Sequence, residues 1–256
     1  MRLIIATAVY FAMAASGLSR QKRVDLSPDQ LTFRPASRPN GIGILVIPGG
    51  GYETVSLDFE GANTTAYLNE RGYDAWVLDY SVATTASTPL YPAPMDQALE
   101  AVAAIRDQDR GAALSKLGIW GYSAGGHLAA MTVTNPDAAL DFGILAYPVI
   151  TMDPAHAHMG SRDNLIGTDP SPDLQAATSA ENTVTGSTPP IFLFHTSDDA
   201  TVDVENTLLF SNAMAAKGRL FQTLILPSGQ HGLGLALNDP VRNWTPELER
   251  WMKYSI

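Results

Sequence analysis

The sequence predicts an α/β fold in which a mostly parallel sheet carries helices on both faces. Short apolar runs recur along the chain, and each is followed by turn residues and then by a stretch with helical periodicity. The 256 residues, 45% of them hydrophobic, are enough to bury one sizeable core. We therefore expect a single domain over residues 19–256, preceded by a leader.

Apolar runs of four to six residues mark the expected strands, which are Ile42–Ile47, Ala75–Tyr80, Leu117–Trp120, Phe142–Tyr147, Ile191–Phe194 and Phe221–Leu226. Apolar residues spaced by three and four mark the expected helices, which are Ala66–Arg71, Met95–Arg106, Ala124–Thr132, Val204–Lys217 and Glu247–Lys253. Right-handed crossovers between parallel strands place the loop after each strand at one edge of the sheet, where ligands of such folds bind.

One connection is longer than the others. About forty residues rich in Pro, Asp, Ser and Thr separate Tyr147 from Pro189, whereas a connection between a strand and a helix is usually much shorter. The segment has too few apolar residues to bury a core of its own. We predict that residues 148–189 form a short lid over the active edge of the sheet.

The first 18 residues read as a secretory signal peptide. Arg2 gives a weakly positive start, Leu3 to Ala12 an apolar run, and Ala12-Met13-Ala14 a small-x-small cleavage site, so the mature chain is expected to begin near Ala15. A buried N-terminal helix is the alternative interpretation. The signal predicts a secreted or periplasmic protein without a membrane span in the mature chain.

The charge and the cysteine content exclude several functions. A formal net charge of −10 argues against a nucleic-acid partner and an anionic membrane surface, because both require clustered Lys and Arg. The chain has no cysteine, which rules out disulfides, thiolate metal sites and cysteine nucleophiles.

The most specific motif is Gly121-Tyr122-Ser123-Ala124-Gly125, which lies where an expected strand ends and an expected helix begins. In this context Gly-x-Ser-x-Gly is typical of the nucleophile elbow of α/β-hydrolases, a sharp turn that projects the serine hydroxyl above the sheet. We predict that Ser123 is the nucleophile.

A serine nucleophile needs a base and a carboxylate that orients the base, and in α/β-hydrolases the acid precedes the histidine in the chain. Asp199 follows one late strand and lies three residues before Val202, so we assign it as the acid, with the adjacent Asp198 as the alternative. His231 follows the last strand and is the predicted base. We interpret His127 as a packing or hydrogen-bonding residue and His195 as structural.

Attack on an ester carbonyl also requires donors for the negative charge on its oxygen. A glycine run, Pro48-Gly49-Gly50-Gly51-Tyr52, directly follows the first strong strand. We predict that the N–H groups of Gly50, Gly51 and Ala124 form the oxyanion hole. A flexible turn is the alternative interpretation of the glycines.

Other motifs carry less weight. No Lys-Ser or Lys-Thr pair follows the glycine run, so a phosphate loop is not supported. Asp153, His156 and His158 could be imagined as a metal site, although such a group on a polar loop is more often solvated surface. We predict neither a metal nor a cofactor.

Taken together, the motifs resemble those of the small α/β-hydrolase esterases that include acetyl xylan esterases and feruloyl-type esterases, often labelled xylanase-B-like. The resemblance runs from about Leu31 to the C-terminus. It rests on Pro48–Tyr52, Gly121–Ala129, Tyr147–Met152, His195–Asp199, Val204–Asn206 and Gly229–Gly234. It implies the same triad of Ser123, Asp199 and His231.

The sequence departs from the group's pattern at two positions. Tyr80-Ser81 stands where the group commonly has Tyr-Arg, so the arginine that would pair near Asp96 is missing, and Asp203 replaces a frequent proline. In this group the segment that resembles His158–Gly167 lies near the substrate mouth. We predict Tyr52, Tyr122 and His158 as substrate-binding residues.

The resemblance implies a serine esterase that removes short acyl groups, most plausibly acetyl, from esterified carbohydrate such as xylan or its oligosaccharides, and the leader adds the expectation that this esterase is secreted. The expected partner is thus a small-molecule or oligosaccharide ester. Because the fold and triad do not fix the leaving group, a broad-specificity lipase, esterase or peptidase is one alternative, and a non-catalytic carbohydrate-binding relative is another.

Overall fold

A seven-stranded sheet organises the part of the chain that the computed structural model describes, residues 26–27, 29–107 and 114–256. The strand order is β1-β3-β2-β4-β5-β6-β7, and every neighbouring pair is parallel except β1 with β3. The strands are β1 (Leu31–Arg34), β2 (Ile42–Ile47), β3 (Asp74–Leu78), β4 (Lys116–Tyr122), β5 (Phe142–Ala146), β6 (Ile191–Thr196) and β7 (Phe221–Leu226). The predicted signal peptide lies outside the described residues.

The expected mostly parallel sheet is thus confirmed, with one strand added. β2 and β7 have the predicted bounds, and the other expected strands differ by a few residues at their ends. β1 was not expected. Its four residues alternate between partly buried and exposed, and its antiparallel partner β3 lies more than forty positions away in the sequence. Only the tertiary fold brings Leu31 opposite Leu78.

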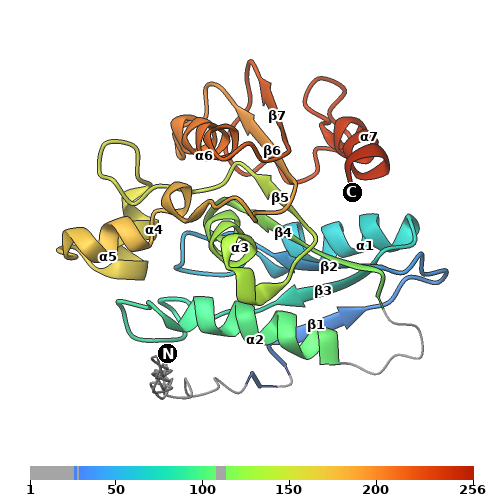
Figure 1. Ribbon diagram of the computed structural model, residues 1–256, viewed down its shortest axis with the longest axis horizontal. Helices are drawn as coiled ribbons and strands as arrows, with labels where there is room; N and C mark the ends of the chain where they lie inside the picture. Colours follow the sequence, from blue (N-terminus) through green and yellow to red (C-terminus); the bar gives the residue numbers. More distant parts are fainter. Residues whose placement is uncertain (1–25, 28, 108–113) are drawn as a thin grey trace, which may run out of the picture.

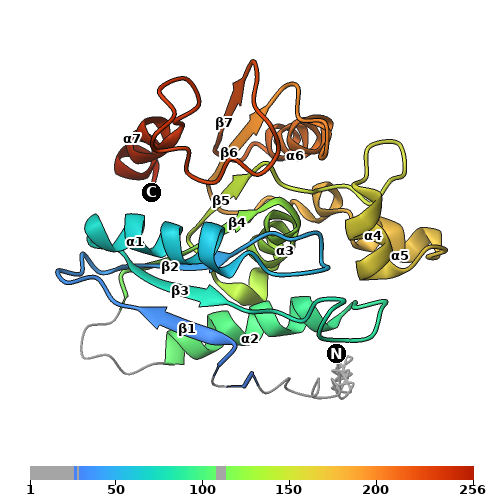
Figure 2. The ribbon, with the colours of Figure 1, turned by 180° about the vertical axis from the view of Figure 1, so that it is seen from behind.

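Helices cover both faces of the sheet (Figure 1, Figure 2). Alternate residues of each strand feed two cores: Leu45 and Ile47 of β2 pack with helices α2, α3 and α6, whereas Ile44 and Val46 pack with α1 and α7. The helical elements are η1 (Leu57–Ala62), α1 (Asn63–Glu70), α2 (Ala93–Asp107), α3 (Ser123–Thr134), η2 (Pro136–Ala138), α4 (Met159–Ile166), α5 (Pro172–Ala177), η3 (Ala180–Thr183), α6 (Glu205–Ala216) and α7 (Thr245–Ser255).

The segment of residues 148–189 contains α4, α5 and η3, which lie together at one end of the molecule (Figure 1). Its apolar residues Leu165 and Ile166 join the main core on the α2–α3 face. Its start is fastened by the fully buried Asn206, whose Oδ1 accepts hydrogen bonds from the N–H groups of Ile150 and Thr151. The segment therefore packs on the domain and shares its core.

The two departures from the esterase pattern each have a local replacement. Ser81 and Gln97 exchange two hydrogen bonds of 2.8 Å where the arginine is missing. Asp203 contacts His156 Nδ1 at 2.8 Å and so joins α6 to the long segment. None of the helices in the described ranges combines the length and the hydropathy that a bilayer crossing requires.

Candidate active site

Ser123 lies at the sharp turn between β4 and α3, at the edge of the sheet where the parallel strands end. Its φ of +52° is in the left-handed region, which a residue with a Cβ rarely adopts. The turn also needs its glycines: a Cβ on Gly121 would lie 2.3 Å from the Gly125 carbonyl oxygen, and one on Gly125 would lie 2.2 Å from the Pro48 oxygen. The sequence motif therefore forms the strained elbow that its spacing predicts.

Two loops at the same edge bring an imidazole and a carboxylate to this serine. Ser123 Oγ lies 2.8 Å from His231 Nε2, and His231 Nδ1 lies 2.7 Å from Asp199 Oδ2. Asp199 can only accept, so His231 carries its proton on Nδ1 and offers the Nε2 lone pair to the serine hydroxyl. The three predicted residues thus form one hydrogen-bonded chain, as a serine hydrolase needs for proton transfer.

Asp199 is held in its ionised form. Burial alone would raise its pKa, but hydrogen bonds from His195 and His231 and from two backbone N–H groups outweigh burial and hold the pKa well below its usual range. The backbone donors are Thr201 and Val202, both on Oδ1. The carboxylate is therefore ionised at neutral pH and available as an acceptor for His231.

The adjacent acid has a different position. Asp198 is exposed, and its Oδ1 accepts a 2.7 Å hydrogen bond from Gly229 N–H, two residues before His231. Thr196 Oγ1 donates to the Gly229 carbonyl oxygen at 2.8 Å. Of the two acids, only Asp199 contacts the imidazole, and Asp198 fastens the histidine loop to the acid loop.

The glycine run after β2 forms a loop beside the serine. The φ angles of Gly50 and Gly51 are +134° and +68°, and a Cβ on Gly50 would lie 2.1 Å from the Thr54 carbonyl oxygen. The carbonyl groups of Gly49, Gly50 and Gly51 all accept hydrogen bonds, which fixes the loop; the donors are Ser56, Glu53, Thr54 and Asn164. Within the described part of the chain, the N–H groups of Gly50, Gly51 and Ala124 have no partner and so can donate to a bound oxygen.

A buried carboxylate that was not predicted links this loop to the histidine loop. Glu60 Oε2 accepts from Gly49 N–H at 2.6 Å, and Oε1 accepts from the Tyr147 hydroxyl at 2.7 Å. The Tyr147 hydroxyl in turn accepts from Gly234 N–H at 2.9 Å, and its ring lies edge-on to His231 with centroids 5.1 Å apart. Burial raises the pKa of Glu60, while its two hydrogen bonds and the nearby His231 lower it in part.

Nothing in the local sequence marks Glu60 as buried, because a lone acidic residue on a short helix is exposed by default. The positive φ of Tyr147, +38°, is likewise visible only in the fold. We use the name Glu60 network for Glu60, Tyr147 and the backbone N–H groups of Gly49 and Gly234, from which these two side chains accept hydrogen bonds. It joins the oxyanion loop at Gly49 to the histidine loop at Gly234.

Tyr52 and Tyr122, which we predicted as substrate-binding residues, are both fully buried, so their side chains do not face the surface of the site. The Tyr52 hydroxyl lies 2.8 Å from His127 Nδ1. Tyr122 directly precedes the serine, and its side chain lies on the α1–α7 face of the sheet. There its hydroxyl forms a hydrogen bond with Thr64 Oγ1. The two tyrosines are therefore part of the core that packs around the elbow and the glycine loop.

His158 does lie beside the site. A Cβ on Gly51 would be 3.9 Å from His158 Cε1, and the proximity of His231 contributes, after burial, to a lowered pKa of His158. His158 caps α4 through Ser161, whereas His156 contacts Asp203. Among the described residues no group of three or more His, Asp or Glu side chains is arranged to hold a metal ion.

Comparison with known proteins places this site in a family. Residues 88–256 match the prolyl oligopeptidase family. The chain is 35% identical over 217 residues to endo-1,4-beta-xylanase B of Butyrivibrio fibrisolvens, covering 79% of this chain and 34% of that protein. It is 30% identical over 246 residues to an acetylxylan esterase of Xylanibacter ruminicola, covering 91% and 50%. The chain thus spans only a third to a half of these relatives.

Among solved structures, the acetyl ester-xyloside bifunctional hydrolase of Caldicellulosiruptor lactoaceticus matches with a TM-score of 0.80 and 34% identity over 93% of both chains. A carboxylesterase of Lactobacillus plantarum matches with a TM-score of 0.74 and 23% identity over 87% of this chain and 91% of that one, which shows the shared fold. The chain therefore belongs to the prolyl oligopeptidase family, in its acetyl xylan esterase-like group of α/β-hydrolases.

Proposed function

We propose that the protein is a serine carboxylesterase that removes acetyl groups from esterified carbohydrate. The observation that carries this proposal is the hydrogen-bonded chain from Ser123 through His231 to Asp199, beside a glycine loop with N–H groups that have no partner among the described residues. The names of the acetylxylan esterase and acetyl ester-xyloside relatives favour an acetylated sugar as the substrate.

The geometry supports a two-step reaction. Ser123 Oγ attacks the ester carbonyl while His231 Nε2 takes its proton, and the negative charge on the carbonyl oxygen is bound by the N–H groups of Gly50, Gly51 and Ala124. His231 then gives its proton to the leaving alcohol, which leaves an acetyl group on Ser123. A water molecule, activated by the same imidazole, hydrolyses this acyl-enzyme and releases acetate.

Two parts of the surroundings complete the proposal. The segment of residues 148–189 forms one wall of the site, with His158 next to Gly51. The signal peptide that the first 18 residues predict would place the enzyme outside the cytoplasm, where polymeric plant carbohydrate is found. A mature N-terminus near Ala15 in protein collected from the culture medium or periplasm tests this; an intact Met1 there would contradict it.

Acetate release tests the activity directly. The wild-type protein is expected to release acetate from acetylated xylan oligosaccharides and nitrophenol from p-nitrophenyl acetate, and Ser123→Ala is expected to lose both activities. Wild-type-like rates in Ser123→Ala would rule out the mechanism. Cleavage of proline-containing peptide amides in preference to acetyl esters would instead assign a peptidase.

A further inference from the structure

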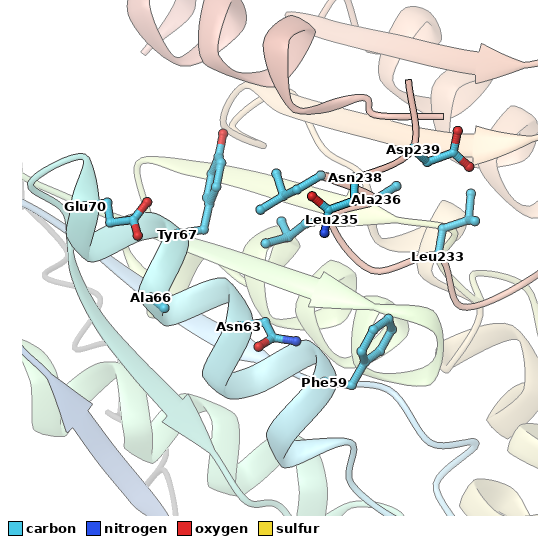
Figure 3. A pocket seen from close by; sticks show the side chains of 11 residues that line it. Phe59, Asn63, Ala66, Tyr67, Glu70, Leu233, Leu235, Ala236, Asn238 and Asp239 are labelled. Atoms are coloured by element: carbon cyan, nitrogen blue, oxygen red, sulfur yellow. The ribbon is translucent and has the colours of Figure 1, made fainter. Parts of the chain in front are cut away.

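A groove of about 650 Å³ lies beside the histidine loop, between the η1–α1 helix and residues 233–239 (Figure 3). Its volume is in the range of small-molecule sites. Phe59 and Leu233 stand at one end, and Glu70 stands at the other (Figure 3). At 1.5 Å per residue the helical wall from Phe59 to Glu70 is on the order of 16 Å long, which exceeds the size of a single sugar ring.

The groove adjoins the histidine loop. Leu233 follows His231 by two residues, and a Cβ on Gly234 would lie only 3.0 Å from the Phe59 ring, so this ring packs on the backbone of the histidine loop. Phe59 also directly precedes Glu60, whose carboxylate holds the oxyanion loop. Both walls are thus continuous with segments that form the site.

The position of the groove beside the histidine loop indicates which part of the substrate it could bind, because His231 transfers protons in a fixed order. His231 takes the serine proton and later gives it to the oxygen of the leaving alcohol, so the alcohol part of an ester must lie on the histidine side of the nucleophile. The groove extends from that side. It is therefore placed to receive the alcohol part of the substrate, with the acyl part at the oxyanion loop.

The side chains of the groove combine apolar surface with neutral polar groups. Phe59 is 52% exposed and Leu237 is 48% exposed, which is unusual for side chains so large beside a catalytic loop. Asn63 and Asn238 are exposed, and within the described part of the chain their amides have no protein partner, so both can donate to and accept from hydroxyl groups. A sugar ring offers both matching surfaces, C–H groups on its face and hydroxyls on its edge.

The charge of the groove excludes an anionic ligand. No Lys or Arg is among the residues that line it, and its two charged members are the acids Glu70 and Asp239. Asp239 is already paired with Arg242 at 3.0 Å. With a net charge of −10 for the whole chain, the ligand that matches this groove is an uncharged polyol.

We propose that this groove binds the sugar chain of the ester substrate on the leaving-group side of the triad, with the Phe59 ring as a stacking platform. The proposal rests on the proposed esterase function and assigns a position to the rest of the glycan. It makes the groove the determinant of preference for an oligosaccharide over a small ester.

The test compares two substrates in groove variants. Phe59→Ala removes the platform, and Ala66→Trp places a bulky side chain in the groove from the exposed face of α1. In both variants, the ratio of kcat/KM on acetylated xylohexaose to kcat/KM on p-nitrophenyl acetate is expected to fall at least fivefold, mainly through KM. Leu220→Ala, at a 68% exposed apolar residue outside the groove, is the matched control, and its ratio is expected to stay within about 1.5-fold.

A second measurement begins with the unaltered enzyme, so its first comparison does not depend on the folding of a variant. Deacetylated xylohexaose is expected to inhibit nitrophenyl acetate hydrolysis by the wild type at concentrations at which xylose does not, and to inhibit Ala66→Trp at least fivefold less strongly. Equal inhibition by the two sugars would overturn the proposal.

The outcomes separate the groove from the function. If the wild type releases no acetate from the oligosaccharide, the proposed esterase function fails. If it does so and the groove variants keep the wild-type ratio, the function stands and the groove assignment is overturned. If the variants instead lose activity selectively on nitrophenyl esters of longer acyl chains, the groove binds the acyl part and the proposal is also wrong.

Discussion

Two histidines contact the same carboxylate, yet only one of them meets the nucleophile. His231 stands on a loop at the rim, with its side chain 17% exposed, one nitrogen on Asp199 and the other on Ser123. His195 lies below it on β6, fully buried, with Nδ1 on Thr207 Oγ1 and Nε2 shared between the Val202 carbonyl and Asp199. Both nitrogens of His195 are therefore occupied by groups of the fold.

His127, on α3, belongs with His195, because its two nitrogens contact the Tyr52 hydroxyl and the Thr178 carbonyl oxygen. We call His127 and His195 the floor histidines and His231 the rim histidine. The difference teaches that an imidazole is available for catalysis where one nitrogen faces a reacting group, and that elsewhere it serves as a buried hydrogen-bond link. The following predictions test this division, beginning with the largest effect.

Replacing the rim histidine should remove activity with little loss of stability. His231→Ala is expected to lower kcat by roughly 10⁵-fold, because Ser123 loses the base that contacts its hydroxyl. The floor variant His195→Gln is expected to lower the free energy of unfolding by about 1–3 kcal/mol, since buried partners lose their bonds, and to keep most of its activity per folded molecule. Steady-state kinetics and urea unfolding of both variants measure the two effects. A large loss of kcat in His195→Gln together with an active His231→Ala would overturn the division into rim and floor histidines.

Replacing Asp199 should lower kcat far more than replacing its neighbour Asp198. Asp199→Asn is expected to lower kcat about 10⁴-fold, since an amide in place of the acceptor oxygen no longer fixes the proton of His231 on Nδ1. Asp198→Asn can still accept from Gly229 N–H and is expected to change kcat less than about fivefold. Comparable losses in the two variants would mean that the carboxylates share the role.

The Glu60 network should have an intermediate effect. In Glu60→Gln an amide NH₂ group replaces one of the two carboxylate oxygens. This group must face either the Gly49 N–H or the Tyr147 hydroxyl, which already accepts a hydrogen bond from Gly234. In either case a buried donor is left without an acceptor. We expect kcat to fall about 10- to 100-fold while KM changes less than threefold, because the oxyanion loop shifts relative to the histidine loop. A lowered melting temperature with unchanged kcat would show that the network serves stability alone.

The last prediction leaves activity aside and concerns the pH dependence of stability that the floor histidine His127 causes. Burial lowers the pKa of His127 from 6.5 to about 4, although the bond to the Thr178 carbonyl raises it in part. Between these pH values the unfolded chain binds a proton that the folded chain does not, so the contribution of His127 is complete above pH 6.5 and declines as the pH falls towards about 4.

A pKa lowered by about 2.5 corresponds to roughly 3 kcal/mol between the two plateaus. Urea unfolding at pH 4.5 and pH 7 measures this dependence in the wild type and in His127→Gln. The variant is expected to be less stable at pH 7 but to lose less stability on acidification. Parallel pH profiles for the two proteins would contradict the assignment of a neutral buried His127.

The sequence predicts those features that are written in local patterns. The strand before Ser123 and the glycines around it form a contiguous motif, and the order of Ser123, Asp199 and His231 is the one that α/β-hydrolases share. The spacing of Asp199 and Val202 also has a physical reason, since the carboxylate caps the N–H of Val202.

Other features depend on residues that meet only in three dimensions. Glu60 and Tyr147 are 87 positions apart, and no local pattern predicts that their side chains bond. The burial of Tyr52 and Tyr122 was missed because a tyrosine beside a catalytic motif is compatible with either face of a sheet. The groove joins the η1–α1 helix to residues 233–239, two segments that lie more than 160 positions apart in the sequence.

Covalent labelling of the purified protein with a fluorophosphonate tests the central claim most directly. We predict a single adduct, mapped by peptide mass spectrometry to Ser123, that forms rapidly in the wild type and at least 10³-fold more slowly in His231→Ala. An adduct on another residue, or labelling of Ser123 at an equal rate without the imidazole, would contradict the account.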